Sequence, residues 1–131
     1  MIRSILEKRM ESFRCAFAGW RQVVESQPNA RIHAVATLLV VGLSVWLELP
    51  RGDWAVLVLG IGLVWTAEML NTAIEYSVDL ASPGRNPLAR ASKDVAAGAV
   101  LAASACAVVI GTLILGPPLW EKLKVLCFWF Y

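Results

Sequence analysis

The sequence predicts an all-α membrane protein with an N-terminal amphipathic surface helix and three transmembrane helices. Of its 131 residues 58% are hydrophobic, and the mean hydropathy is +0.63. Soluble domains are nearer about 45–50% apolar. Three apolar segments approach or exceed the length of about 20 residues that a membrane-spanning helix needs. The net charge of +2 gives no basis for a nucleic-acid partner.

The N-terminal segment, residues 1–28, has the spacing of an amphipathic helix. Its large apolar residues recur every three or four positions, at Ile2, Leu6, Met10, Phe13, Phe17, Trp20 and Val24. Most of its basic residues fall on the other face, which predicts a helix lying on the membrane surface. A soluble helix packed on another helix is the alternative. Ser26 to Asn29, with Pro28 inside, predicts the break where the chain turns into the bilayer.

The transmembrane core, residues 29–116, contains expected spans at about 32–49, 54–78 and 95–115. Six basic residues precede the first span, one lies in the first loop and three lie in the second loop. This asymmetry places the N-terminus and the second loop on the cytoplasmic side. Residues 117–131 form a tail after two prolines, and its aromatic residues predict an anchor at the outer interface.

A polar stripe interrupts the second span and is the main functional signal. At about 100° per residue, one helix face collects Glu68, Asn71, Thr72, Glu75 and Asp79. A carboxylate inside a membrane helix costs about 2.5–3.5 kcal/mol on insertion scales and marks a functional site. The expected topology puts Glu75 near the cytoplasmic interface and Glu68 about 10 Å deeper.

The residue types in this region suit phosphoryl transfer to an alcohol. A carboxylate such as Glu75 can hold Mg²⁺, which prefers oxygen ligands and often bridges protein to phosphates. Arg85 and Lys93, on the same side of the membrane, can bind phosphate oxygens. The deeper Glu68 suits a general base. The residues alone leave three readings open: lipid-directed catalysis, a transporter or proton relay, and a structural role in assembly.

Small residues recur every four positions on the third span. They are Ala99, Ala103, Ala107 and Gly111. Such stripes permit close contact between membrane helices. Because a single three-span chain is expected to shield the two glutamates poorly, this stripe favours packing against other protomers.

Two sequence blocks resemble the prokaryotic diacylglycerol kinase family, which includes the undecaprenol kinases. The first runs from Ala67 to Glu75 and is followed by Asp79; the second runs from Lys93 to Val100. The resemblance covers roughly residues 12–115. It implies a homotrimer of the bacterial cytoplasmic membrane. It also implies transfer of the γ-phosphate of ATP, with Mg²⁺, to a lipid alcohol at the cytoplasmic interface.

The resemblance also implies residue roles. Glu68 matches the catalytic base and contacts the lipid, and Glu75 matches the metal ligand. The positions that match nucleotide contacts are Lys8, Cys15, Gln27, Glu75, Gly84, Arg85, Asn86, Lys93 and Asp94. The positions that match surroundings of the lipid headgroup are Asn29, Ala30, Arg31, Ile32, His33 and Ala97.

Two positions depart from the family pattern. Gln27 stands where many members have a glutamate that shares the metal, so its amide brings no negative charge. Cys15 stands where many members have an aromatic residue. The acceptor is open between diacylglycerol and undecaprenol. The Asn-Thr core and the Arg-Ile-His segment are closer to the Gram-positive and cyanobacterial type, in which undecaprenol is a common acceptor.

Overall fold

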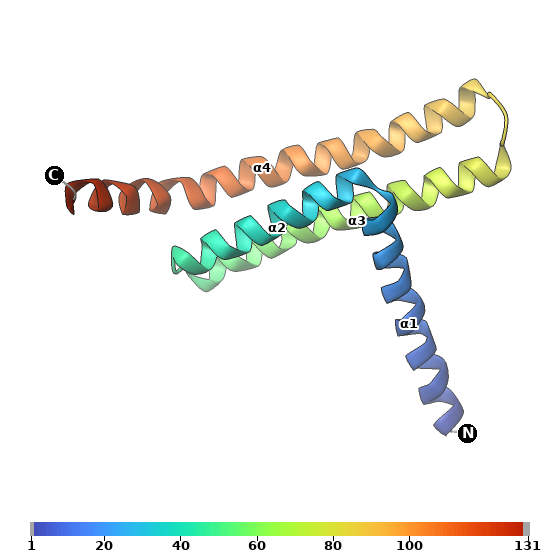
Figure 1. The fold of residues 1–131 in the computed structure, drawn as a ribbon, viewed down its shortest axis with the longest axis horizontal. Helices are drawn as coiled ribbons and strands as arrows, with labels where there is room; N and C mark the ends of the chain where they lie inside the picture. The colour runs from blue at the N-terminus through green and yellow to red at the C-terminus, as the bar shows by residue number, and fades with distance from the viewer. Residues whose placement is uncertain (1, 130–131) are drawn as a thin grey trace.

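The protein is a chain of four helices in the computed structural model, which describes residues 2–129 (Figure 1). They are α1 (Ile2–Ser26), α2 (Pro28–Trp46), α3 (Arg51–Ala81) and α4 (Pro87–Trp129). The last three are long and apolar enough to cross a membrane. The all-helical prediction with three potential spans is therefore confirmed. The break between α1 and α2 falls at Gln27, inside the segment predicted for it.

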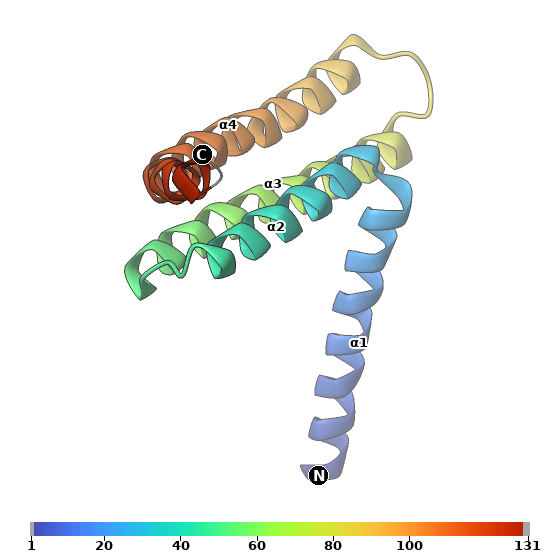
Figure 2. The same ribbon diagram turned by 60° about the vertical axis from the view of Figure 1, so that its left-hand side comes forward.

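Helix α1 leaves the bundle of the other three helices at a steep angle (Figures 1 and 2). Its C-terminal end packs against α2 and α3. Val23 lies in a cluster with Ala30 and Trp65, and the ring centroids of Trp20 and Trp65 are 4.8 Å apart. Pro28 can start α2 because the first turn of a helix needs no partner for its missing N–H. The rest of α1 leaves large apolar side chains exposed, namely Leu6, Met10, Phe13 and Phe17.

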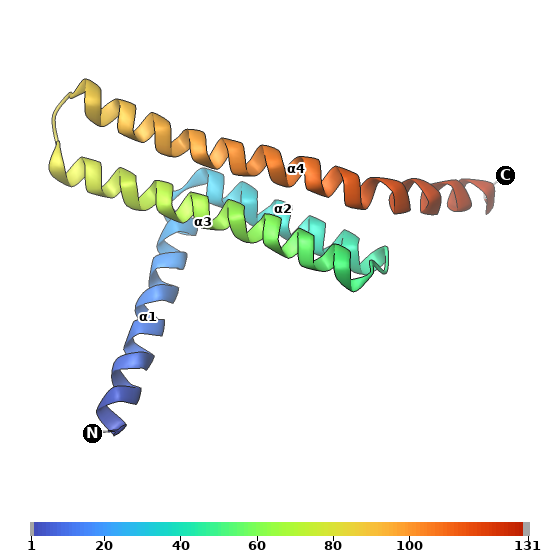
Figure 3. The ribbon, with the colours of Figure 1, turned by 180° about the vertical axis from the view of Figure 1, so that it is seen from behind.

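Helices α3 and α4 form a long antiparallel hairpin, and α2 lies against it (Figure 3). A tight turn joins α2 to α3, in which Glu48 adopts a left-handed conformation with φ of 56°. At this end Leu47, Leu57 and Leu115 form a second buried cluster. The two clusters hold opposite ends of α2 against the hairpin.

The tail after the third span is a continuation of α4. Helix α4 continues through Pro117 and Pro118 to Trp129 (Figure 1). Lys122 in this continuation lies 4.8 Å above the ring of Trp46 and donates to its carbonyl oxygen. The predicted aromatic anchor depends mainly on Phe128, Trp129 and the last two residues. The side chains of these residues lie outside the described part of the chain.

The stripe of small residues on α4 faces mainly into its own protomer. Ala103 is buried, and Ala107 and Gly111 line a cavity between α2, α3 and α4. Ala99 is exposed, and a Cβ atom added at Gly111 would meet no atom of another helix within 4 Å. Close packing within the chain therefore does not account for the whole stripe, and its role in assembly stays a prediction.

Candidate functional site

A polar pocket of about 320 Å³ lies between α2, α3 and α4, beside the junction with α1. Many of the predicted site residues line it: Gln27, Asn29, Ile32, His33, Glu68, Asn71, Glu75 and Ala97. They come from positions up to 70 residues apart, so the fold brings together what the sequence separates. Val100, Leu101 and Ser104 of α4 complete the lining.

Glu68 is buried by its own chain, with 1% of its surface exposed. The expectation that one protomer shields this residue poorly is therefore wrong. Helix α3 presents Glu68 inward, and α2 covers it from one side with His33. The polar stripe then emerges gradually from the protein, because Asn71 and Thr72 are buried, Glu75 is half-buried and Asp79 is exposed.

Four buried polar atoms have no hydrogen-bond partner among the described residues, and all four belong to residues that line this pocket. They are His33 Nε2, Glu68 Oε2, Asn71 Oδ1 and Ser104 Oγ. Buried polar groups in folded proteins are nearly always paired, because an unpaired one costs about 1–3 kcal/mol. Their convergence on one pocket indicates that the pocket is built to receive a polar group.

The deepest two of these atoms are close to each other. His33 Nε2 and Glu68 Oε2 are 3.9 Å apart, which is too long for a hydrogen bond. A single oxygen atom between them can bond to both at ordinary distances of about 2.8 Å. An alcohol fits this position because its oxygen both donates and accepts.

Glu75 lies toward the open end of the pocket and is held by two amides. Gln27 Nε2 donates to Glu75 Oε2 and Asn71 Nδ2 donates to Glu75 Oε1, each at 3.1 Å. Gln27 and Glu75 are thus direct neighbours, although 48 positions separate them. Thr72 instead donates to the backbone carbonyl of Glu68 and stabilises the helix locally.

The loop end of the α3–α4 hairpin, where α3 turns into α4, carries the charged residues. Lys93 Nζ lies 2.5 Å from Asp79 Oδ1, and Asp94 lies 3.8 Å from Arg90. The loop with Gly84, Arg85 and Asn86 is exposed at this end. Lys93 is one helical turn before Ala97, which lines the pocket, so it shares that face of α4.

Other predicted residues lie apart from the pocket. Arg31 turns back to the carbonyl oxygens of Val24 and Glu25 at the end of α1, and Ala30 is buried in the first cluster. Lys8 and Cys15 are exposed on the projecting part of α1. Nothing in the structure tests the roles predicted for these four positions.

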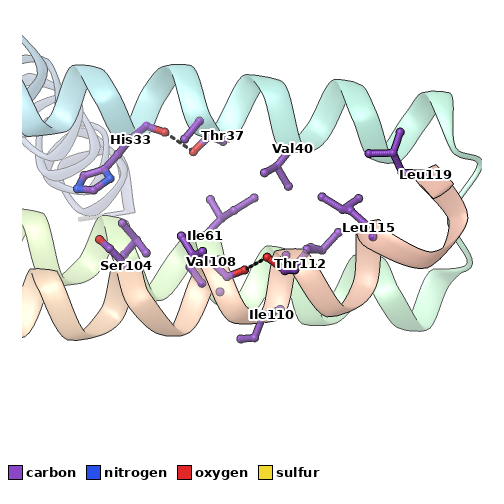
Figure 4. A pocket seen from close by; sticks show the side chains of 17 residues that line it. His33, Thr37, Val40, Ile61, Ser104, Val108, Ile110, Thr112, Leu115 and Leu119 are labelled. Carbon is purple, nitrogen blue, oxygen red and sulfur yellow. Dashed lines mark hydrogen bonds between the residues drawn. The ribbon is translucent and has the colours of Figure 1, made fainter. Parts of the chain in front are cut away.

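A larger, mainly apolar cavity of about 470 Å³ continues from the polar pocket. His33 and Ser104 line both spaces. Figure 4 shows His33 of α2 and Ser104 of α4 near one end of the apolar cavity, with Leu115 and Leu119 toward the other. Ser104 was not among the predicted site residues. The feature that could have indicated it is a hydroxyl residue eleven positions after Lys93, on the same face of α4.

Comparisons with known proteins identify the family of this chain. The model of the family described as "Prokaryotic diacylglycerol kinase" matches residues 14–115. The undecaprenol kinase of Bacillus subtilis is 38% identical over 89% of this chain and 95% of its own length. The diacylglycerol kinase of Synechocystis is 43% identical over 82% of this chain and 62% of its own length.

A third relative, the diacylglycerol kinase of Escherichia coli, is 31% identical over 76% of this chain and 82% of its own length. The family match covers most of the three-helix core and includes both polar sequence blocks. With the three apolar helices, these relatives identify a bacterial multi-pass membrane protein. The chain belongs to the prokaryotic diacylglycerol kinase family and is a lipid kinase.

Proposed function

We propose that this protein transfers the γ-phosphate of ATP to the hydroxyl group of a membrane lipid at the cytoplasmic interface. The observation that carries the proposal is the convergence of four unpartnered buried polar atoms on one pocket, with the buried carboxylate of Glu68 among them. This pocket opens on one side toward charged residues and on the other toward an apolar cavity. A lipid alcohol has the matching combination of one polar group and a long apolar chain.

The acceptor hydroxyl binds between His33 and Glu68. Its proton is donated to Glu68 Oε2, and its oxygen accepts a hydrogen bond from His33 Nε2. During transfer Glu68 takes the proton, the oxygen forms a bond to the γ-phosphorus, and the bond from that phosphorus to the bridging oxygen of ADP breaks. The apolar surroundings exclude water, which would otherwise compete as acceptor.

The nucleotide binds nearer the loop end of the hairpin. Along α3 the polar residues pass from the buried Glu68 through the half-buried Glu75 to the exposed Asp79. Lys93 faces Asp79 from α4, at the same level. A phosphate chain that runs outward from the acceptor hydroxyl meets Glu75 and then Lys93, whose ammonium group can exchange Asp79 for a phosphate oxygen.

The residues around Glu75 fit Mg²⁺ bound together with ATP. They supply one carboxylate and two amide groups, all with the hard oxygen atoms that Mg²⁺ prefers. The buried Asn71 Oδ1 has no partner, and a half-turn of the Gln27 amide presents its oxygen to the same space. When bound, Mg²⁺ neutralises charge on the phosphates. Because Gln27 is neutral, the protein contributes a single negative charge from this pair.

Membrane placement and assembly belong to the same proposal. The exposed apolar residues of α1, including Phe13 and Phe17, are suited to the membrane interface beside the polar pocket. This orientation places the second loop in the cytoplasm, where ATP is available. The homotrimer follows from the family resemblance, and analytical ultracentrifugation in detergent measures it directly.

The decisive experiment is the Glu68→Gln variant, assayed for phosphate transfer from labelled ATP to lipid in mixed micelles. Loss of the base lowers turnover by about 10²–10⁴-fold, whereas the folded protein stays at least as stable because a buried charge is removed. Ser44→Ala is the matched control at a buried position outside the pocket, and it keeps normal turnover.

A folded Glu68→Gln protein with near-normal turnover would contradict the role of Glu68. The transporter or proton-relay alternative has a separate signature, namely ion flux in proteoliposomes without transfer of phosphate to any lipid. Beyond Ser104 the cavity is lined mainly by apolar side chains such as Val108, Ile110 and Leu115, which favours a lipid chain over an ion.

A further inference from the structure

Ser104 behaves differently from most of the described serine and threonine residues of these helices. Seven described serine and threonine side chains donate to the carbonyl oxygen four residues earlier. They are Ser12, Thr37, Ser44, Thr72, Ser77, Ser92 and Thr112. This local bond is how a hydroxyl group is normally satisfied inside an apolar helix. Ser104 Oγ is shielded from solvent, and yet it makes neither this bond nor any other with the described part of the chain.

The position of Ser104 explains what its hydroxyl group can meet. It lines both the polar pocket and the apolar cavity, and His33 is the other residue that lines both. A lipid whose hydroxyl group binds between His33 and Glu68 therefore passes Ser104 where its polar head becomes an apolar chain. The next few atoms after the reacting hydroxyl are those that lie closest to Ser104 Oγ.

We propose that Ser104 determines acceptor specificity by donating a hydrogen bond to an ester carbonyl close to the reacting hydroxyl. The proposal rests on the proposed function and names its substrate class: glycerol esters such as diacylglycerol. In diacylglycerol an ester carbonyl follows within a few atoms of the free hydroxyl. In undecaprenol the hydroxyl is followed directly by an isoprenoid chain, which offers no acceptor and leaves the Ser104 hydroxyl group unpaired.

The site selects between acceptors because an acceptor without a carbonyl oxygen leaves the buried Ser104 hydroxyl group without a partner. A site that hydrogen-bonds a substrate group discriminates strongly against analogues without that group, because its own polar atom is then buried and unsatisfied. For one neutral hydrogen bond we expect a preference of about 10-fold, which corresponds to about 1.4 kcal/mol. Removing the hydroxyl from Ser104 should abolish this preference and leave the chemical step intact.

The test compares two acceptors of nearly equal shape, a diacylglycerol and the dialkylglycerol ether that lacks both carbonyl oxygens. Undecaprenol is the third acceptor, and kcat/KM is measured for each with wild-type protein and Ser104→Ala. We expect wild type to favour the ester over the ether by about 10-fold, and Ser104→Ala to bring this ratio to about 1. Values for the ether and for undecaprenol should rise toward that for the ester, since Ser104→Ala removes the buried hydroxyl group that these acceptors leave unpaired.

Two further variants keep the result specific. Ser104→Thr retains a hydroxyl group and should restore most of the ester preference. Ser44→Ala removes a buried hydroxyl group that is already bonded to Val40, and it should leave the ratio unchanged. A variant that merely disturbs packing lowers all three kcat/KM values together, without changing their ratios.

The experiment distinguishes a failure of the Ser104 role from a failure of the proposed function. If wild type phosphorylates lipids but does not prefer the ester, or if Ser104→Ala keeps the preference, the role of Ser104 is wrong and the lipid kinase assignment stands. Transfer to undecaprenol alone overturns the role of Ser104 in the same way. If wild type transfers phosphate to none of the three acceptors, the proposed function fails, and this inference fails with it.

Discussion

Buried polar groups lack partners at one end of the three-helix bundle and are hydrogen-bonded at the other. At the polar end, defined by the pocket around Glu68, Asn71 and Glu75, four shielded polar atoms have no described partner. At the apolar end, defined by the cluster of Leu47, Leu57 and Leu115, the nearby buried hydroxyl of Ser44 is bonded to its own helix.

This difference separates stability from function. The apolar end follows the usual rule for a folded core, with apolar side chains buried and polar groups paired. The polar end departs from that rule, and unpaired buried groups persist in native proteins mainly at functional sites. Substitutions at the two ends should therefore change different measurements, namely stability at the apolar end and kinetics at the polar end.

The largest effect on stability is expected at the apolar end. Leu57→Ala removes a side chain that is 4% exposed and should lower the free energy of unfolding by about 2–5 kcal/mol. The KM for Mg·ATP should stay within about twofold, because the proposed nucleotide site is at the other end. Denaturation midpoints and steady-state kinetics measure the two quantities. Leu59→Ala on the same helix, 74% exposed, is the matched control and should cost much less.

At the polar end, Glu75→Gln should chiefly weaken nucleotide binding. It removes the charge proposed to hold Mg·ATP, and we expect the apparent KM for Mg·ATP to rise about 10–100-fold, with little change in the denaturation midpoint. The same change at the exposed Glu121 near the other end should have no effect. Unchanged dependence on Mg²⁺ in Glu75→Gln would remove this residue from the nucleotide site.

Gln27→Glu adds a second carboxylate beside Glu75 at the polar end. Without metal, two carboxylates then face each other at the position of the present 3.1 Å hydrogen bond, so the denaturation midpoint should fall. Mg²⁺ should restore the midpoint by binding the folded state, and the Mg²⁺ concentration for half-maximal activity should fall about 3–10-fold.

Gln22→Glu, at an exposed position of α1, controls for the added charge. If Mg²⁺ stabilises the Gln27→Glu protein no more than it stabilises wild type, Gln27 does not border the metal.

The smallest effect is expected from Lys122→Met at the apolar end. The Lys122 ammonium lies 4.8 Å above the Trp46 ring and joins α4 to the end of α2. Its loss should lower the free energy of unfolding by about 0.5–1 kcal/mol and leave transfer rates unchanged. Lys124→Met is the control, because Lys124 contacts Glu121 and Trp120 of its own helix. An equal loss in both variants would show that the contact between helices contributes nothing specific.

The helices and most pocket residues could be predicted because periodicity and composition are local properties. The spacing from Glu68 to Asp79 was sufficient to place five polar side chains on one face of α3. Ser104 could not be predicted in the same way, since a serine in a membrane helix normally bonds to its own backbone. Whether Ser104 departs from this rule depends on which residues of α2 face it.

Hydropathy and helical geometry act residue by residue, so they were enough to predict the class of protein, the three spans and the polar face of one helix. The burial of Glu68 by a single chain, the contact of Gln27 with Glu75 and the return of Arg31 to α1 became visible in the packed structure. These facts depend on contacts between residues far apart in the sequence. Such contacts are fixed by how the helices pack, which no local pattern specifies.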